Sequence, residues 1–242
     1  MEYIEFEALF CQSMQKNNLS IPHPNAIKQF FDFTNHLLQV NQITNLTAIR
    51  NIPDTITKHL VDSLLCSEYL PQGARVLDIG CGPGFPSLPL AIFRPDLEIV
   101  AIDSTAKKIA FVQETAKMLG LSNIQAISGR AEDAALAKKI GKFDIVVSRA
   151  VAKMSILSEL CLPYLEKGGK FIALKAAKAE EELAEAKNAI QILGGGDVVL
   201  HEKQLFLFED TAERRCLIEV KKIGKTPAGY PRSYGAISKK PL

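Results

Sequence analysis

The sequence lacks the segments that mark membrane and secreted proteins. No stretch approaches about 18 uninterrupted apolar residues, and the chain begins with acidic side chains where a secretory signal would carry basic ones. The five cysteines lie far apart, form no Cys-x-x-Cys pair and are odd in number, which disfavours both a disulfide framework and a zinc knuckle. We therefore expect free thiols in a cytoplasmic protein with no membrane partner.

Metal-ligand patterns and a strong net charge are also missing. The four histidines are scattered, with no His-Glu-x-x-His pattern and no cysteine at ligand spacing, so we predict no metal site. The formal net charge is +2, from 29 basic and 27 acidic residues. So small a charge is silent about nucleic acids, because phosphate binding needs only a local basic surface. The composition is typical of globular proteins.

The first part of the chain has helical patterning. Apolar residues Phe30, Phe33 and Leu37 recur at three- and four-residue spacing after Pro24. We predict a helical N-terminal extension over residues 1–70, with an apolar face that packs onto the following domain rather than onto a dedicated partner. No heptad seam is visible, so we expect a monomer.

Residues 71–223 alternate short β-rich runs with helical segments, which predicts βαβ units, right-handed crossovers and a mostly parallel sheet covered by helices on both faces. Two last runs, joined through residues 209–213, predict an antiparallel hairpin that completes a seven-stranded α/β sheet. The predicted strands are 75–80, 98–103, 123–128, 143–149, 170–175, 198–208 and 214–223.

The final helix and the C-terminus carry opposite charges. The predicted helix 178–193 has an acidic run, Glu180, Glu181 and Glu182, which we interpret as a solvated face. From residue 221 onward there are six Lys or Arg, no acid, three prolines and three glycines. This composition predicts a basic tail, residues 224–242, that is poor in regular structure.

The most informative motif is VLDIGCGPGFP, residues 76–86, where an apolar strand runs into Gly80-x-Gly82-x-Gly84 and then into a helix. Glycines let the backbone turn tightly and approach a ligand closely. A dinucleotide-binding GxGxxG motif would have its last glycine where this chain has Phe85, which disfavours a nicotinamide cofactor.

Polar residues at the ends of the next strands supply the rest of a predicted binding crevice, because ligands of open α/β sheets bind at the carboxyl ends of strands. Asp103 ends the second strand, where a carboxylate can accept hydrogen bonds from both ribose hydroxyls. Arg130, Ala131 and Glu132 follow the third strand, on the rim where an adenine ring would lie, and Arg149 ends the fourth.

Two of these residues also have a plainer interpretation. Asp103 could cap the next helix, which Ser104 or Thr105 would begin. Arg149 could form a structural ion pair with a carboxylate. Lys175, at the end of the fifth strand, is a weaker candidate for the same crevice.

These segments together resemble the bacterial small-subunit ribosomal RNA methyltransferase G family, also called glucose-inhibited division protein B. The resemblance rests on the glycine-loop region, AIDSTAKKIAFVQETAKMLGLSNI, GRAED, DIVVSRAVA, GGKFIALK and ERRCLIEVKK. It extends to VNQITNLTAI and HLVDSL upstream and to the terminal YPR and KKPL, and so covers nearly the whole chain. Cys81 and Gly129 are minor departures from the family's usual residues.

The resemblance implies a class I, Rossmann-like, S-adenosylmethionine-dependent methyltransferase. Such enzymes methylate the seven-position nitrogen (N7) of one guanine in a decoding-region loop of 16S rRNA, so the implied partner is 16S rRNA or the small ribosomal subunit. It also places cofactor contacts on Gly80, Phe85, Ala131, Glu132 and Arg149. With the loop and the ribose acceptor, the expected cofactor-binding residues are Gly80, Gly82, Gly84, Phe85, Asp103, Ala131, Glu132 and Arg149.

The implied reaction needs little from side chains. The N7 of guanine carries an in-plane lone pair, so it can attack the methyl group without first losing a proton, and no general base is required. Because the product base is cationic, positive charge should not crowd it. We therefore assign the catalytic candidates Arg130 and Arg149 to phosphates or to the oxygen of the base.

RNA recognition would combine phosphate contacts with stacking of an extruded base. The sheet-edge arginines Arg214 and Arg215 and the basic tail are the candidate phosphate contacts, and Phe85 or Tyr230 could offer a stacking face. A packing role for the aromatics and a solvated, disordered tail are the alternatives.

Three rival functions remain. A methyltransferase acting on a small molecule would keep its activity without the tail. A binding module that had lost the chemistry would show a degraded glycine loop, whereas Gly80, Gly82, Gly84 and Asp103 are all present. A nicotinamide-dependent oxidoreductase is disfavoured by the loop spacing.

Overall fold

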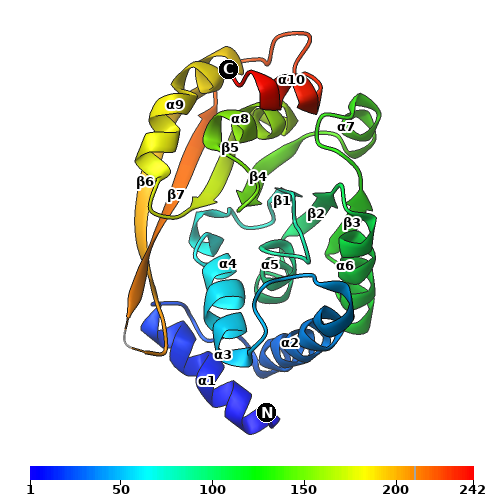
Figure 1. Ribbon diagram of the computed structural model, residues 1–242, viewed down its shortest axis with the longest axis vertical. Coiled ribbons are helices and arrows are strands. Elements are labelled where there is room, and N and C mark those ends of the chain that lie inside the picture. The colour runs from blue at the N-terminus through cyan, green and yellow to red at the C-terminus, as the bar shows by residue number, and fades with distance from the viewer. Residues whose placement is uncertain (210) are drawn as a thin grey trace.

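The structure, a computed structural model, describes residues 1–209 and 211–242 as an α/β molecule with its two termini at opposite ends of the long axis (Figure 1). One residue of the predicted 209–213 linker, residue 210, lies outside the described part of the chain. Among the described residues, no helix combines the length and the apolar character needed to cross a membrane.

A seven-stranded sheet in the order β3-β2-β1-β4-β5-β7-β6 forms the centre of the molecule. Strands β1 to β5 are parallel, and β7 lies between β5 and β6, antiparallel to both. The predicted α/β fold, including the closing hairpin, is confirmed. The strands are β1 (Arg75–Ile79), β2 (Glu98–Asp103), β3 (Ile124–Ser128), β4 (Phe143–Arg149), β5 (Leu165–Lys175), β6 (Gly195–Phe206) and β7 (Ala212–Lys222).

Helices cover both faces of the sheet, so alternate strand residues belong to different cores. Val76 packs in one core with the N-terminal helices and α5, whereas its neighbour Leu77 packs in the other with α8 and α9. The helices after the first strand are α5 (Ser87–Phe93), α6 (Ala106–Met118), α7 (Ala134–Ile140), α8 (Met154–Cys161), the 3-10 turn η3 (Leu162–Tyr164), α9 (Ala179–Ile192) and α10 (Tyr234–Lys239).

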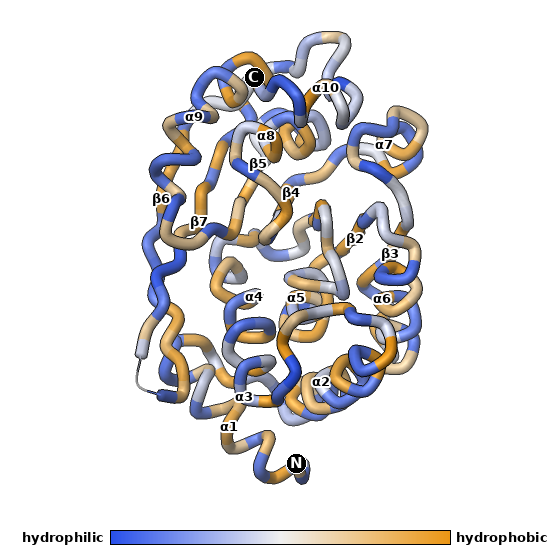
Figure 2. Tube along the Cα trace, in the orientation of Figure 1, coloured by the Kyte–Doolittle hydropathy of each residue, from blue (hydrophilic) through white to orange (hydrophobic). Residues whose placement is uncertain are grey.

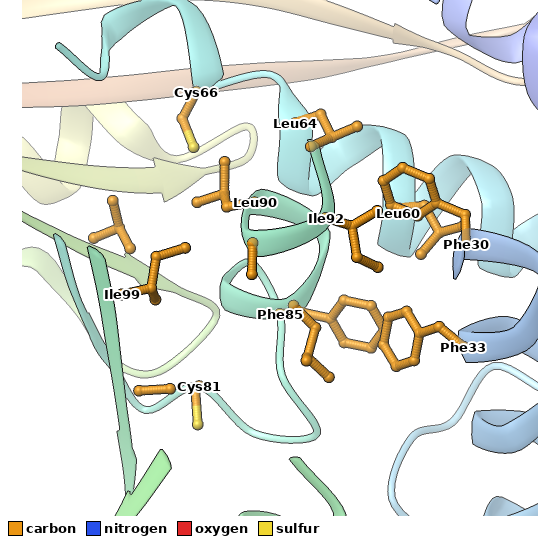
Figure 3. Close-up of a cluster of buried hydrophobic side chains, with 14 of the residues drawn as sticks. Phe30, Phe33, Leu60, Leu64, Cys66, Cys81, Phe85, Leu90, Ile92 and Ile99 are labelled. Carbon is orange, nitrogen blue, oxygen red and sulfur yellow. The ribbon is translucent and has the colours of Figure 1, made fainter. Parts of the chain in front are cut away.

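The N-terminal helices share the first of these cores, as the predicted apolar face required. Phe10 and Phe30 are fully buried with ring centroids 4.8 Å apart, and Phe33 lies 5.4 Å from Phe85 of the glycine loop (Figure 3). Close packing of this kind makes the N-terminal region part of the wall around the loop. Its elements are α1 (Tyr3–Lys16), α2 (Pro24–Thr44), α3 (Ile52–Asp54), the π-helix η1 (Thr55–Val61), α4 (Asp62–Leu64) and η2 (Ser67–Tyr69).

Helix α9 corrects one sequence interpretation. Hydrophobic and hydrophilic residues alternate along it (Figure 2), with Ala186 and Ile190 buried. Glu182 is not solvated as predicted: its Oε2 accepts the Met154 N–H at 2.9 Å and pairs with Lys175 Nζ at 2.7 Å. The register of α9 against β5 and α8 brings an acid of the run inward, which charge pattern alone does not reveal.

The tail is also more regular than predicted. Residues 234–239 form α10, and Ile237 is fully buried in the core beside α8. Tyr230 and Leu242 pack against the same core, so burial of apolar and aromatic side chains helps to hold this basic segment on the domain.

Candidate active site

A cavity of about 590 Å³ opens at the carboxyl ends of β1 to β4, a volume in the usual range for small-molecule sites. Parallel register explains its position, because Ile79 pairs with Ile102 and Asp103 pairs with Ser128, so the strands end at one edge. The predicted residues that line it are Gly80, Gly82, Phe85, Asp103, Arg130, Ala131, Glu132 and Arg149.

The glycine loop has backbone conformations that would be strained in any residue other than glycine. Gly80 and Gly82 adopt φ of +73° and +56°. A Cβ on Gly80 would lie 2.4 Å from Val151 Cγ2, whereas one on Gly82 would meet no atom within 4 Å. Gly84 does not line the cavity: its φ is +97°, and a Cβ there would lie 2.4 Å from Leu88 Cδ1. Because Gly84 has no side chain, Leu88 of α5 can pack closely against the loop.

Asp103 fixes the loop from the neighbouring strand. Its Oδ2 accepts the Gly82 N–H at 3.0 Å and its Oδ1 accepts the Thr105 N–H at 2.7 Å. The second bond is the cap-like contact at the start of α6 that the plainer interpretation of Asp103 named. Because a carboxylate oxygen can accept two hydrogen bonds, each oxygen retains capacity for a ribose hydroxyl.

Asp78 lies beneath the loop and was not a sequence candidate. It is fully buried, and Oδ2 accepts the Ser87 N–H at 3.2 Å, while Oδ1 has no hydrogen-bond partner among the described residues. Burial raises the pKa of this carboxyl to about 7. The available signal was an acid inside an apolar strand, since a buried carboxyl needs a structural reason.

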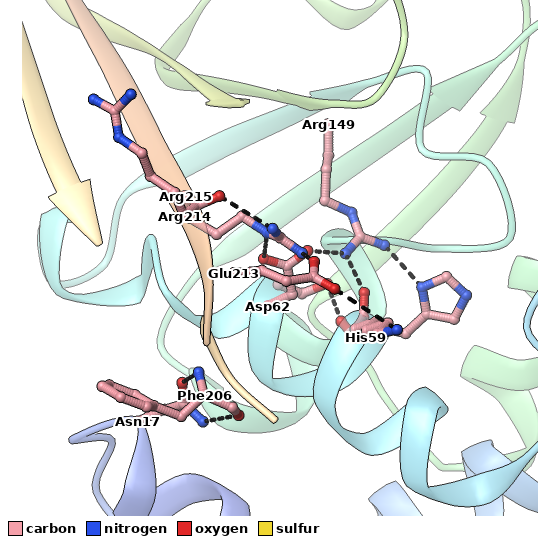
Figure 4. A network of polar contacts seen from close by, with 10 residues as sticks. Asn17, His59, Asp62, Arg149, Phe206, Glu213, Arg214 and Arg215 are labelled. Atoms are coloured by element: carbon pink, nitrogen blue, oxygen red, sulfur yellow. Dashed lines mark hydrogen bonds and ion pairs between the residues drawn. The ribbon is translucent and has the colours of Figure 1, made fainter. Parts of the chain in front are cut away.

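Arg149 lines the cavity as predicted, and a residue of the N-terminal region also holds it in the ion pair that the plainer interpretation named. Its Nη1 lies 3.2 Å from Asp62 Oδ2, and Arg215 Nε lies 2.8 Å from the other oxygen (Figure 4). Nη1 also donates to the Lys58 carbonyl, and Nη2 contacts His59. The guanidinium has five N–H donors, so Nε and one N–H of Nη2 have no acceptor among the described residues. Those donors can serve a ligand in the cavity.

His59 completes this wall and was missed by sequence reasoning. It lies in the π-helix η1, stacks on Phe85 with centroids 4.3 Å apart, and places Nε2 2.7 Å from Thr47 Oγ1. Arg149 Nη2, 3.3 Å from Nδ1, can only donate, so Nδ1 accepts and Nε2 carries the proton. π-Helical turns are rare and frequent at functional sites. The HLVDSL segment contained this histidine, but its position over the loop depends on tertiary packing.

His59 predicts a pH dependence of stability. Burial, and then the Arg149 charge, lower its pKa to about 3. The folded state therefore resists protonation, and the stabilisation present above the unfolded pKa, near 6.5, is lost as the pH falls. Between pH 7.5 and pH 5, urea unfolding should show a loss about 2 kcal/mol larger in the unaltered chain than in His59→Gln.

The comparison between the two chains isolates the histidine, because Asp78 and the other acids are the same in both. Equal pH dependence in the two chains would mean that His59 is already accessible to protons in the folded state. A His23→Gln variant is the control, since His23 only caps the start of α2.

The cavity rim after β3 combines one buried apolar residue with two charged residues. Ala131 is buried and its carbonyl accepts the Tyr164 O–H at 2.8 Å, which orients this turn. The Arg130 side chain is 61% exposed and lies 3.7 Å from Glu132. An exposed cation at the mouth of a cavity is available to an anionic partner, whereas Glu132 points to the more enclosed side, 14% exposed.

Several predicted contacts are engaged elsewhere in the fold. Lys175 does not line the cavity, because its Nζ is bound by Glu182 and the Ala152 carbonyl. Arg214 pairs with Glu180 and Glu202, and Arg215 with Asp62 and Glu213, so RNA contact by either remains a prediction that requires these pairs to open. Phe85 is 4% exposed and packs as the plainer interpretation had it. Within the described residues, no group of three or more His, Cys, Asp or Glu is placed to hold a metal ion.

Comparison with known proteins supplies the family. The family model described as rRNA small subunit methyltransferase G matches residues 26–206. The chain belongs to the rRNA small subunit methyltransferase G family. The resemblance found in the sequence is therefore confirmed, and with it the assignment of the chain to the methyltransferase enzymes.

The relatives match over nearly their full length. Ribosomal RNA small subunit methyltransferase G of Lactobacillus delbrueckii subsp. bulgaricus is 41% identical over 97% of this chain and 98% of its own. The protein of that name from Brevibacillus brevis is 45% identical over 89% of this chain and 90% of its own. The solved structure of M. jannaschii TYW2 in complex with AdoMet is similar in fold, with a TM-score of 0.55, 16% identity, and coverage of 73% of this chain and 80% of that one.

Proposed function

We propose that the chain transfers the methyl group of S-adenosylmethionine to the N7 of one guanine in a decoding-region loop of 16S rRNA. The observation that carries the proposal is the cavity at the carboxyl ends of β1 to β4. In a chain of this methyltransferase family, it gathers nearly all of the residues expected for the cofactor.

The cavity residues fit this cofactor. Gly82 leaves open space where any other residue would place a side chain, and Asp103 keeps acceptor capacity for a ribose. Ala131 and Leu160 supply apolar surface at the β3 side. When bound, S-adenosylmethionine supplies an electrophilic methyl group on a sulfonium.

The chain's own residues position the cofactor and the guanine, and they do not exchange protons with either. His59 stays neutral, with its one N–H donated to Thr47, so it neither acts as a base toward guanine nor adds positive charge. Among the described residues, Arg149 is the one cation of the cavity wall at the carboxyl end of β4. Its two remaining N–H donors suit the oxygen of a base or a phosphate. Catalysis would then rest mainly on alignment, which can contribute about 7 to 11 kcal/mol.

The proposed partner is 16S rRNA, alone or within the small subunit. The relatives carry this substrate class in their names. Arg130, exposed at the mouth, and Lys108, in the cavity wall, are the nearest candidates for phosphate contacts. Binding that depends on such contacts should weaken as salt concentration rises.

The test is the transfer of labelled methyl from S-adenosylmethionine to 16S rRNA and to small subunits that lack the modification, followed by nuclease mapping. We expect label in 7-methylguanosine at a single site. No label in either RNA, from a chain shown to bind the cofactor, would overturn the RNA assignment and favour a small-molecule acceptor. Comparing the two substrates also shows whether naked RNA is sufficient.

A further inference from the structure

We propose that Tyr234, on the C-terminal tail, forms the outer wall of the cavity at its adenine end and is a cofactor-binding residue. This inference rests on the proposed function, because it takes S-adenosylmethionine as the occupant. It gives the tail a role different from the phosphate contacts expected of its basic residues.

The tail is anchored firmly enough to build a wall. Glu159 of α8 is fully buried, and Arg232 reaches it with Nε at 2.8 Å and Nη2 at 2.6 Å. The backbone N–H of Arg232 donates to the same carboxylate at 2.8 Å. Paired bonds from one guanidinium fix orientation as well as distance. Ile237, buried beside α8, holds the other side of α10.

This anchor sets Tyr234 at the mouth of the cavity. Figure 1 shows α10 beside α8, at the end of the molecule that carries the C-terminus. The Tyr234 ring lines the cavity together with Ala131 and Leu160, and the Arg130 guanidinium lies 6.0 Å from its centroid. Tyr234 is nonetheless 40% exposed. An aromatic ring that is held at a cavity rim, with Arg130 over one face and exposed surface remaining, is suited to stacking on a planar ligand.

Strand order decides which planar group would lie there. Along the cavity edge the order is β3, β2, β1, β4, and Asp103, the ribose acceptor, ends β2. The buried Arg149, His59 and Phe85 group lies on the β1 and β4 side, and Tyr234 with Arg130 lies on the β3 side. The two ends of the cofactor must leave the ribose in opposite directions. The end with the polar, enclosed wall suits the reacting sulfonium and the guanine, which leaves the β3 end, where Ala131 and Leu160 supply apolar surface, for adenine.

Calorimetric titration of the full-length chain with S-adenosylhomocysteine, without RNA, tests the inference. Tyr234→Ala should weaken binding about tenfold, because one stacked face is lost. Tyr234→Phe, which keeps the face, should bind like the unaltered chain. Ser238→Ala, an exposed change on the same helix, should leave affinity unchanged.

A second variant tests the anchor independently. Arg232→Lys keeps the charge but loses the paired bonds to Glu159, and it should weaken binding of S-adenosylhomocysteine. Combined with Tyr234→Ala, it should cause no further loss, since both act through one ring. Additive losses would overturn the proposed link between anchor and ring.

The outcomes separate this inference from the proposed function. If the unaltered chain fails to bind S-adenosylhomocysteine, the proposed cofactor is wrong and the inference falls with it. If it binds and Tyr234→Ala binds equally well, only the inference falls. A Tyr234→Ala chain that keeps its cofactor affinity but binds 16S rRNA more weakly would assign the ring to RNA and overturn the proposal.

Discussion

Gly82→Val should weaken the binding of S-adenosylmethionine about 100-fold, equivalent to about 2.7 kcal/mol. Gly82 lines the cavity, and a Cβ there would meet no protein atom within 4 Å, so the new side chain would project into open space at the cavity wall. Asp103 accepts the Gly82 N–H, so displacement of the loop would also disturb the proposed ribose acceptor. Equilibrium titration with the cofactor measures the effect.

Gly73→Val is the matched control. Gly73 has a φ of +69°, close to the +56° of Gly82, and a Cβ there also meets nothing within 4 Å. It precedes β1 and does not line the cavity. Both variants therefore carry a similar backbone penalty, about 1–2 kcal/mol of stability, but only Gly82→Val should lose affinity. Equal affinities in the two variants would place the cofactor away from the glycine loop.

Arg149→Ala should lower the single-turnover rate of methyl transfer about 100-fold at saturating cofactor and RNA. The expected loss is that of a preorganised charged donor that faces a reacting group. The guanidinium also lies 5.2 Å from the centroid of Phe85 and contacts His59, so its removal frees two neighbours to shift. Rapid quenching of labelled product at a single enzyme turnover measures the rate.

Arg215→Ala controls for the buried ion pair. Arg215 pairs with the same Asp62 carboxylate but does not line the cavity, so its removal should change stability more than the transfer rate. If Arg149→Ala keeps the full single-turnover rate and an unchanged RNA affinity, Arg149 acts only as a partner for Asp62 and its proposed role at the base is wrong.

Most of the fold could be predicted because its signals are local. The predicted strands 98–103 and 143–149 match β2 and β4 without error. The residues at strand ends could be placed in one crevice for a geometric reason: parallel strands bring their carboxyl ends to the same edge, so Gly80, Asp103 and Arg149 meet although they lie far apart in sequence.

Residues brought to the cavity by packing could not be predicted in this way. His59 stacks on Phe85 from a π-helical turn, and no spacing rule for an ordinary helix describes that turn. Tyr234 lies at the rim because Arg232 pairs with the buried carboxylate of Glu159, 73 positions earlier in the chain. Charge and composition had predicted a tail poor in regular structure and a solvated acidic run, and both are partly buried because each has a partner on another element.

The sequence alone determined the strand and helix pattern, the glycine loop, the acid that ends β2 and the family. These features depend on side-chain periodicity and on backbone conformations that few residues other than glycine adopt readily. Only the tertiary structure decided which charges are paired, which histidine stays neutral and which part of the tail borders the cavity. Those properties depend on burial and on partners distant in the chain, and a buried charge or ring acquires its role from the atoms packed against it.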